Sequence, residues 1–229
     1  MTAPEVSSTH SWGQMRILAV ALTLALLGTL PAAAADPADT ATDAAGAPAA
    51  APAEQQQPPF GLKWGMQIAD LGALGIKIDS TTQNGSLSIV NVKEMPGAFP
   101  DTGTVNMLFD RRLGLVKVRW TSTGISDDPT GTKGRARYGE MKKVVTQIRG
   151  NPSDETMVVG ARLFDQEDEF YQCLSYEGCG VWSSLWEQKP SGGVLLSIEG
   201  TGPGKGYVQI DYESPDWQKV VAAPAAAAR

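Results

Sequence analysis

Two cysteines are the first residues in this chain whose type and spacing could do chemistry. Cys173 and Cys179 lie six positions apart, and Gly178 and Gly180 allow the tight turn that would bring them within bridging range. We expect a disulfide, because such pairs are oxidised in exported proteins. A redox pair would need the Cys-x-x-Cys spacing at a helix start, which this pair lacks. Free thiols are the remaining alternative, and the favoured role is structural.

The chain has one histidine, His10, and it lies in a segment that we expect to be removed on export. The mature chain would then lack the histidine of Ser-His-Asp and Cys-His catalysis and of imidazole metal sites. Carboxylate pairs and Ser-Lys chemistry remain. Candidate carboxylates are Asp127, Asp128 and the acidic run 165–169, for which a solvated loop and a capped helix start are the simpler explanations. We therefore predict no enzyme activity, no cofactor and no metal.

Aromatic and basic residues with the spacing of a strand or helix face could form a binding surface instead. The candidates are Trp182, Trp186, Lys117, Arg119, Arg135 and Lys142. The two tryptophans share one strand face, the first two cations share another, and the last two belong to a basic helix. Core packing is the alternative for the tryptophans, and a solvated face is the alternative for the helix.

Hydrophobic periodicity predicts the elements that must position these residues. The longest predicted helix covers residues 135–149, with apolar residues at steps of three and four and a stop at Gly150. A shorter helix is predicted at 67–74, and another begins with Asp165 as its N-cap. Strands are predicted at 76–78, 87–92, 105–109, 115–121, 157–164, 180–187, 194–199 and 207–212. The Asn84-Gly85 pair predicts a tight turn between the first two strands.

This order of elements predicts an α+β fold, an antiparallel sheet with two main helices packed on one face. Charged and apolar residues alternate in the strand 115–121, which predicts that the other face of the sheet is solvated. The segments 64–75 and 138–150 each combine an aromatic-glycine pair, a helix and a glycine stop. A pseudo-repeat is therefore a further hypothesis.

Residues 1–35 have the features of a secretory signal peptide. Arg16 precedes an apolar run at 17–30, and Ala33 and Ala35 fit the small positions before a cleavage site. The run is shorter than the about 20 residues that span a bilayer, so cleavage is favoured over an uncleaved membrane anchor. Met15 is an alternative start. No cysteine lies near the cleavage site, so no lipid anchor is expected.

Composition divides the exported chain into three parts. Residues 36–59 are rich in alanine and proline with almost no large apolar residue, which predicts a disordered linker. Residues 60–218 are long enough for one domain with a core, and residues 219–229 repeat the linker composition as a predicted disordered tail. The net charge of −6 favours solubility and argues against nucleic-acid binding. We expect a periplasmic or secreted protein.

The opening Gly61-Leu-Lys-Trp-Gly-Met66 before a helix is similar to the start of small bacterial periplasmic proteins of unknown function. With Gly150-Asn-Pro152 and the order of elements, it also resembles the outer-membrane assembly lipoprotein BamE and β-lactamase-inhibitor-like domains. The resemblance implies a protein-binding module rather than an enzyme. The leading hypothesis is a non-catalytic module that binds another envelope protein or a cell-wall component. The alternative is a carboxylate-dependent hydrolase acting on envelope glycans.

Overall fold

The structure, a computed structural model, describes residues 57–161, 163–188 and 192–222. The chain divides into two units, Met1–Ala47 and Pro48–Arg229, and the described residues all belong to the second unit. The expected signal peptide, residues 36–56 of the expected linker and residues 223–229 of the expected tail lie outside the described residues. Within the described residues no helix is long and apolar enough to cross a membrane.

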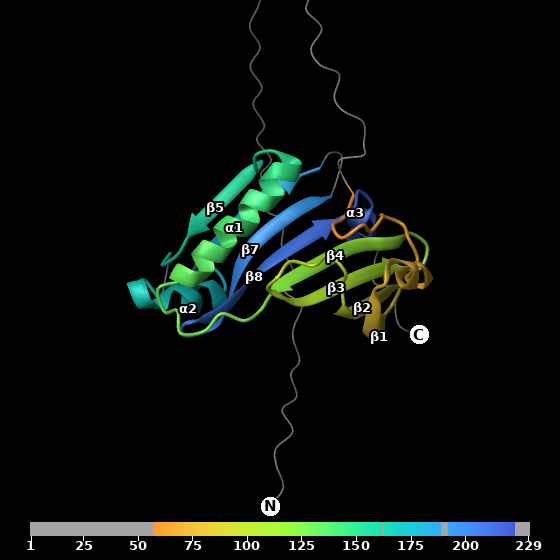
Figure 1. The fold of residues 1–229 in the computed structure, drawn as a ribbon. Helices are drawn as coiled ribbons and strands as arrows, with labels where there is room; N and C mark the ends of the chain where they lie inside the picture. Colours follow the sequence, from red (N-terminus) through yellow and green to blue (C-terminus); the bar gives the residue numbers. More distant parts are fainter. Residues whose placement is uncertain (1–56, 162, 189–191, 223–229) are drawn as a thin grey trace, which may run out of the picture. The chain divides into compact units, whose positions relative to one another are not determined.

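In the described part of the chain, eight strands form one antiparallel sheet (Figure 1). They are β1 (Lys77–Asn84), β2 (Leu87–Glu94), β3 (Thr102–Asp110), β4 (Gly114–Ser122), β5 (Asp154–Val158), β6 (Val181–Glu187), β7 (Gly193–Gly202) and β8 (Lys205–Glu213). The helical segments are the 3₁₀ helices η2 (Ile68–Leu74) and η3 (Glu167–Glu169) and the α-helices α1 (Thr132–Arg149), α2 (Phe170–Ser175) and α3 (Trp217–Ala222). The antiparallel sheet and the α+β class confirm the prediction from sequence.

The strands are ordered β1-β2-β3-β4-β8-β7-β6-β5 across the sheet. Consecutive strands pair in two meanders, β1 to β4 and β5 to β8, and the meanders meet where β4 pairs with β8. The predicted turn between β1 and β2 is confirmed: β1 ends at Asn84, and Gly85 has a φ of 61°, which glycine adopts without steric cost. The pairing of β4 with β8 brings residues about 90 positions apart in the sequence side by side.

Several element boundaries differ from the prediction, most clearly at three places. The edge strand β5 pairs with β6 only up to Val158, because Gly160, with a φ of 74°, then turns the chain away from the sheet. Asp165 is not the N-cap of a helix. Gln166 precedes η3 instead, and its backbone N–H donates to the Glu169 carboxylate at 3.1 Å. The helix α3 includes residues 219–222, which the composition had assigned to the tail.

The helix α1 packs against β7 and β8, across which it lies in Figure 1. Its residues Tyr138, Met141 and Val145 are buried, as the apolar stripe predicted. The fourth residue of the stripe, Ile148, is 68% exposed, so the prediction of a continuous buried stripe is wrong at its last position. The spacing of apolar residues shows which face of the helix is apolar. How much of that face is buried depends on how far the sheet extends beneath the helix.

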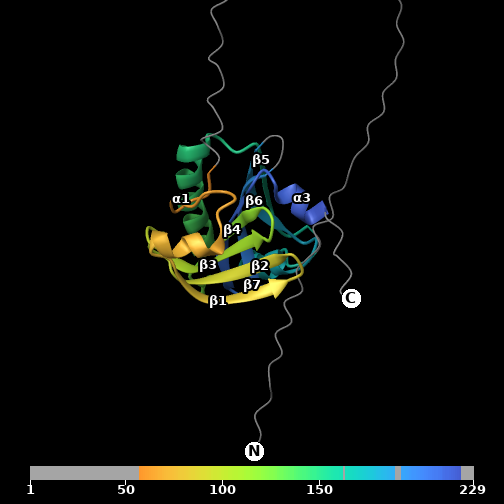
Figure 2. The ribbon, with the colours of Figure 1, turned by 90° about the vertical axis from the view of Figure 1, so that its right-hand side faces the viewer.

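The helix α3 lies on the opposite side of the sheet from α1 (Figure 2). The ring of Trp217 on α3 stacks on Lys117 of β4, with the ammonium nitrogen 4.9 Å from the ring centre. Val118 and Trp120, which alternate with the charged residues of β4, are fully buried in the core. The sheet therefore separates an apolar interior on the α1 side from charged residues on the other face.

Candidate functional site

Cys173 and Cys179 form a disulfide, as predicted. Their Cα atoms lie 5.1 Å apart, and both residues are fully buried. The bond joins α2 to the turn before β6, where Gly178 has a φ of 77°. A Cβ atom on Gly180 would lie 2.7 Å from the carbonyl oxygen of Val158, so glycine is needed for this close approach. The disulfide therefore holds a local corner and presents no thiol to a substrate.

Replacing both cysteines by alanine is expected to lower the free energy of unfolding by about 2 kcal/mol, because the closed loop is short and restricts the unfolded chain only modestly. Urea denaturation followed by tryptophan fluorescence measures the change. The variant should remain folded without urea, since the bond joins segments that are already neighbours in sequence. A double variant that is unfolded in the absence of urea would contradict this expectation.

Lys117 and Arg119 lie on the face of β4 opposite α1, but they are not the solvated pair that the alternating pattern predicted. Lys117 is only 9% exposed, and its ammonium nitrogen lies 3.0 Å from Asp211 and 2.9 Å from Glu213. Arg119 donates a hydrogen bond of 2.7 Å to each carboxylate oxygen of Asp211. The register of β4 and β8, which pairs residue 119 with residue 211, produces this contact. Both cations are therefore engaged by carboxylates of the same sheet.

The candidate cations of α1 also have partners within the domain. The guanidinium carbon of Arg135 lies 4.8 Å from the ring centre of Phe170 and 5.5 Å from that of Trp182, a cation–π arrangement. Lys142 forms an ion pair with Glu155 on β5. Arg135 therefore holds α1 against α2 and β6, and Lys142 holds α1 against β5. Each of the two charges already has a partner within the domain.

The two tryptophans of β6 lie on the side of the sheet that α1 covers. Trp186 is buried, and its indole N–H donates to the carbonyl oxygen of Gly150 at 2.9 Å. Trp182 is partly buried and makes edge-to-face contacts with Tyr138 and Phe170. Both rings therefore pack in the core, the alternative to a binding face, although Trp186 also reaches a hollow at the surface.

The candidate carboxylate Asp128 has a structural role. It is buried, and it accepts hydrogen bonds from the backbone N–H of Gly134 at 3.0 Å and from the hydroxyl of Tyr171 at 2.8 Å. Burial acts to raise the pKa of Asp128, but these donors and the backbone N–H groups of Lys133 and Thr132 hold the pKa below its ordinary value. Asp128 is therefore ionised at neutral pH and anchors the start of α1.

The acidic run at 165–169 includes the 3₁₀ helix η3. Residues 165–168 are exposed, and among the described residues no three His, Cys, Asp or Glu side chains are close enough together to hold a metal ion. Asp127, the other candidate carboxylate, is exposed in the loop before α1. The structure thus does not bring the candidate carboxylates Asp127 and Asp128 together with the acidic run as one cluster.

One cluster, with a buried serine and tyrosine and a more exposed lysine and glutamate, combines the side-chain types of a potential nucleophilic site. The hydroxyl oxygen of Ser184 lies 2.6 Å from that of Tyr138 and 2.5 Å from Glu155, which also pairs with Lys142. Ser184 is only 1% exposed, and burial raises the pKa of Tyr138 to about 12. Hydrogen bonds from Lys142 and Ser184 lower the pKa of Glu155, which makes it a weak base. The cluster therefore ties α1 to β5 and β6.

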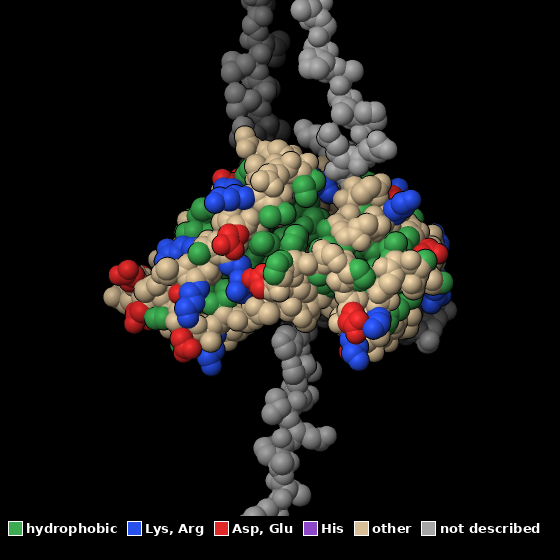
Figure 3. Space-filling model, in the orientation of Figure 1, with side chains coloured by type: hydrophobic (Ala, Val, Ile, Leu, Met, Phe, Trp, Pro, Cys, Tyr) green, Lys and Arg blue, Asp and Glu red, His purple; other side chains and the backbone are tan. Residues whose placement is uncertain are grey.

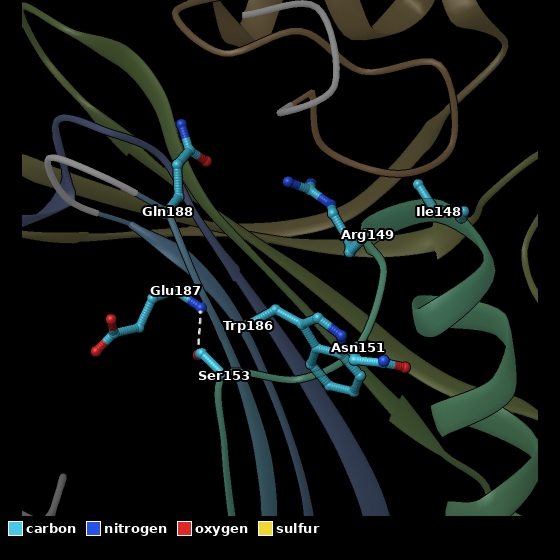
Figure 4. A pocket seen from close by; sticks show the side chains of 7 residues that line it. All are labelled: Ile148, Arg149, Asn151, Ser153, Trp186, Glu187 and Gln188. Atoms are coloured by element: carbon cyan, nitrogen blue, oxygen red, sulfur yellow. Dashed lines mark hydrogen bonds between the residues drawn. The ribbon is translucent and has the colours of Figure 1, made fainter. Parts of the chain in front are cut away.

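Two surface hollows that share Ile148 and Arg149 lie at the end of α1, at a site that the sequence did not indicate, and we call them together the α1-end hollow. Its apolar part, about 270 Å³, is lined by residues 57–60, 97, 99, 144–145, 148–149 and 212. Its polar part, about 150 Å³, is lined by residues 148–149, 151, 153 and 186–188 (Figure 4). Ile148 and Arg149 line both parts, and hydrophobic side chains gather beside the upper part of α1 in Figure 3.

One wall of the α1-end hollow comes from residues that the composition had assigned to the linker. Pro58 is buried, and the side-chain oxygen of Gln57 accepts a hydrogen bond of 3.3 Å from the backbone N–H of Trp64. Residues 57–59 thus line the hollow although they precede the domain boundary predicted at residue 60. Composition did not reveal this, since proline-rich segments have the same composition whether they pack or not.

Arg149 is the cation of the α1-end hollow. Its Nη2 donates to the carbonyl oxygen of Gln57 at 3.0 Å, and none of the ion pairs among the described residues includes Arg149. Burial lowers the pKa of Arg149, although Tyr212 acts to raise it. The guanidinium stays charged at neutral pH, because arginine has an ordinary pKa of about 12.5 or above. Figure 4 shows the Glu187 side chain pointing away from Arg149.

Comparisons with protein-family models, with curated proteins and with solved structures find no match to this chain. The similarity of the opening motif to envelope proteins stays a prediction. The function is therefore inferred from the geometry of the described residues.

Proposed function

We propose that this protein is an exported, non-catalytic binding module that acts in the periplasm or outside the cell. The observation that carries the proposal is the α1-end hollow, where an exposed isoleucine, aromatic rings and a half-buried cation line one concave surface. Mostly apolar hollows with a few polar groups are typical of binding sites. The disulfide and the signal-like segment at residues 1–35 support export.

Among the residues that line the hollow, Ile148 gives the strongest evidence for a binding partner. It continues the stripe whose other members pack on the sheet, yet it is exposed beside an apolar surface. Covering apolar surface stabilises a complex by about 25 cal/mol per Å² removed from water. A partner that covers Ile148 and the neighbouring proline and phenylalanine side chains would gain this free energy of burial. The partner that we propose is another envelope protein or a cell-wall component.

The scaffold that we propose behind this site is a pseudo-repeat with two helices on one face of the sheet. The 3₁₀ helix η2 precedes the meander β1–β4, and α1 precedes the meander β5–β8. The helix α2 contacts β7, the strand against which α1 also packs. In such an arrangement the two halves share one continuous sheet, and the end of α1 stays open to a partner.

Ile148→Lys is expected to reduce capture of the partner from an envelope extract by at least about tenfold, because the lysine puts a hydrated charge where the partner buries apolar surface. The full chain carries an affinity tag, and the captured proteins and glycans are quantified by mass spectrometry. The substitution should leave the fold intact, since residue 148 is exposed and a cation near a helix C-terminus is favourable.

Val221→Lys is the matched control for this experiment. Val221 is 53% exposed on the helix α3, so it tests the effect of the same substitution at an exposed apolar position outside the hollow. The control should capture as much partner as the wild type. Equal capture by the wild type and Ile148→Lys, or no captured component with the wild type, would refute the proposed function.

A further inference from the structure

Arg149 gives the α1-end hollow a chemical preference. A guanidinium offers five N–H donors. Among the described residues this one donates to a single backbone carbonyl, that of Gln57, and pairs with no carboxylate. A half-buried cation without a counter-ion costs free energy, which an incoming anion would recover. The hollow is therefore suited to an anionic group at its centre, where Arg149 borders both parts.

The apolar part of the hollow begins next to this cation. Its walls are formed by Pro58 and Phe60 on one side and by Val144 and Ile148 of α1 on the other. A volume of about 270 Å³ is near the lower end of the range for small-molecule pockets. A short hydrocarbon chain or a single ring would fit this size, and a large cofactor would not.

The charge of the hollow selects among anions. Arg149 is the one cationic side chain among the described residues that line either part, and the carboxylate of Glu187, which also lines the polar part, points away from it (Figure 4). A dianion such as a phosphate monoester would keep an unbalanced charge there. A carboxylate carries one negative charge, and its two oxygens match the planar fork of a guanidinium. The single cation therefore favours a monocarboxylate.

The polar part of the hollow adds neutral groups beside the cation. The hydroxyl of Ser153 is already engaged, since it accepts from the backbone N–H of Glu187 at 3.0 Å and donates to the carbonyl of Leu185 at 2.9 Å. The amide side chain of Asn151 also lines this part (Figure 4). Amides can donate to a carboxylate without adding a second charge.

Building on the proposed binding function, we propose that the group of the partner which the α1-end hollow recognises is a monocarboxylate with an apolar tail, a ligand for which a small free acid can serve as the probe. The carboxylate pairs with Arg149, and the tail lies along Phe60, Phe99 and Val144 in the apolar part. This ligand satisfies the guanidinium and covers Ile148 at the same time. It also explains why one surface carries both an exposed aliphatic side chain and a cation with no carboxylate partner among the described residues.

Isothermal titration with octanoate tests the ligand class on the full chain. Octanoate is expected to bind the wild type, and acetate and 1-octanol are expected to bind at least about tenfold more weakly, because each lacks one of the two recognised groups. Arg149→Gln is expected to weaken octanoate binding by about 10- to 100-fold, the effect of losing hydrogen bonds to a charged group. Lys143→Gln, which removes an exposed cation of α1 outside the hollow, should bind like the wild type.

Thermal unfolding separates a lost site from a lost fold. Octanoate should raise the melting temperature of the wild type and should leave that of Arg149→Gln unchanged, since a ligand stabilises only a native state that binds it. Without ligand Arg149→Gln should still unfold in one cooperative transition, which shows that the fold is kept. Equal octanoate affinity of the wild type and Arg149→Gln would overturn the role of the cation. Absence of octanoate binding to the wild type would overturn the ligand class, while the result with Ile148→Lys still decides the proposed function separately.

Discussion

Asp211→Ala is expected to lower the free energy of unfolding by about 3–5 kcal/mol, the usual effect of removing one partner from a buried ion pair. Asp211 is 3% exposed and accepts two hydrogen bonds of 2.7 Å from Arg119, while the ammonium nitrogen of Lys117 lies 3.0 Å away. Its removal leaves two neighbouring cations with Glu213, which pairs with Lys117, and Glu199, whose charge acts on Arg119, as nearby carboxylates. Urea denaturation of both proteins at pH 7 measures the loss.

The pH dependence of this loss of unfolding free energy tests whether the loss comes from the charged carboxylate of Asp211. Burial acts to raise the pKa of Asp211, but the hydrogen bonds from Arg119 and the charges of Lys117 and Arg119 hold the pKa below its ordinary value. A carboxyl with a lowered pKa stabilises the folded state above its unfolded pKa of about 3.9, and the contribution is lost as the pH falls below that value. The difference between wild type and Asp211→Ala should therefore be full at pH 7 and shrink below about pH 4. A difference that persists unchanged to pH 2 would contradict the ion-pair origin.

Glu199 on β7 provides a control, because its pKa is shifted in the opposite direction from that of Asp211. Burial raises the pKa of Glu199, although the hydroxyl of Ser197 and the charge of Arg119 act to lower it. The charged form of this residue is therefore disfavoured in the folded state. Glu199→Gln should stabilise the domain at neutral pH, and the gain should disappear below the unfolded pKa of about 4.3. A loss of stability at pH 7 comparable to that of Asp211→Ala would show that the cluster needs both carboxylates.

Local features of the fold could be predicted because their causes lie within a few residues. Gly85 permits the left-handed turn after β1, and Gly150 ends α1 where the apolar stripe stops. The disulfide followed from the short spacing of Cys173 and Cys179. The alternation of β4 likewise predicted which of its residues share a face, and with it the antiparallel sheet.

The partners of the charged residues could not be predicted, because they lie far away in the sequence. Arg119 and Asp211 are 92 positions apart, and so are Arg149 and Gln57. The pattern of β4 defines its two faces, but the neighbouring strand decides whether a charged face meets water or carboxylates. The α1-end hollow has the same origin, since it forms where residues 57–60 meet the last turn of α1.

At the start of α1, a carboxylate from the preceding loop takes the place of a side chain at the N-cap position. Gly131 precedes the helix with a φ of 72° and has no side chain to accept from the first N–H groups. Asp128 accepts from the N–H of Gly134 instead, and its second partner, the hydroxyl of Tyr171, comes from α2. A Cβ atom on Gly134 would lie 2.2 Å from this hydroxyl, so glycine allows α2 to approach the helix start. Asp128 thus joins the loop, α1 and α2.

Asp128→Ala is therefore expected to lower the free energy of unfolding by about 3 kcal/mol, since it leaves a buried hydroxyl and several helix N–H groups without their charged acceptor. Asp128→Asn keeps an acceptor but loses the charge, so it should cost about half as much. Asp127→Asn is the matched control, because asparagine tolerates the φ of 52° at this exposed position, and its effect should be close to zero. Urea denaturation gives the three values, and hydrogen exchange should show faster opening at residues 132–134 in Asp128→Ala. Equal effects of the substitutions at 127 and 128 would mean that the carboxylate of Asp128 does not hold the start of α1.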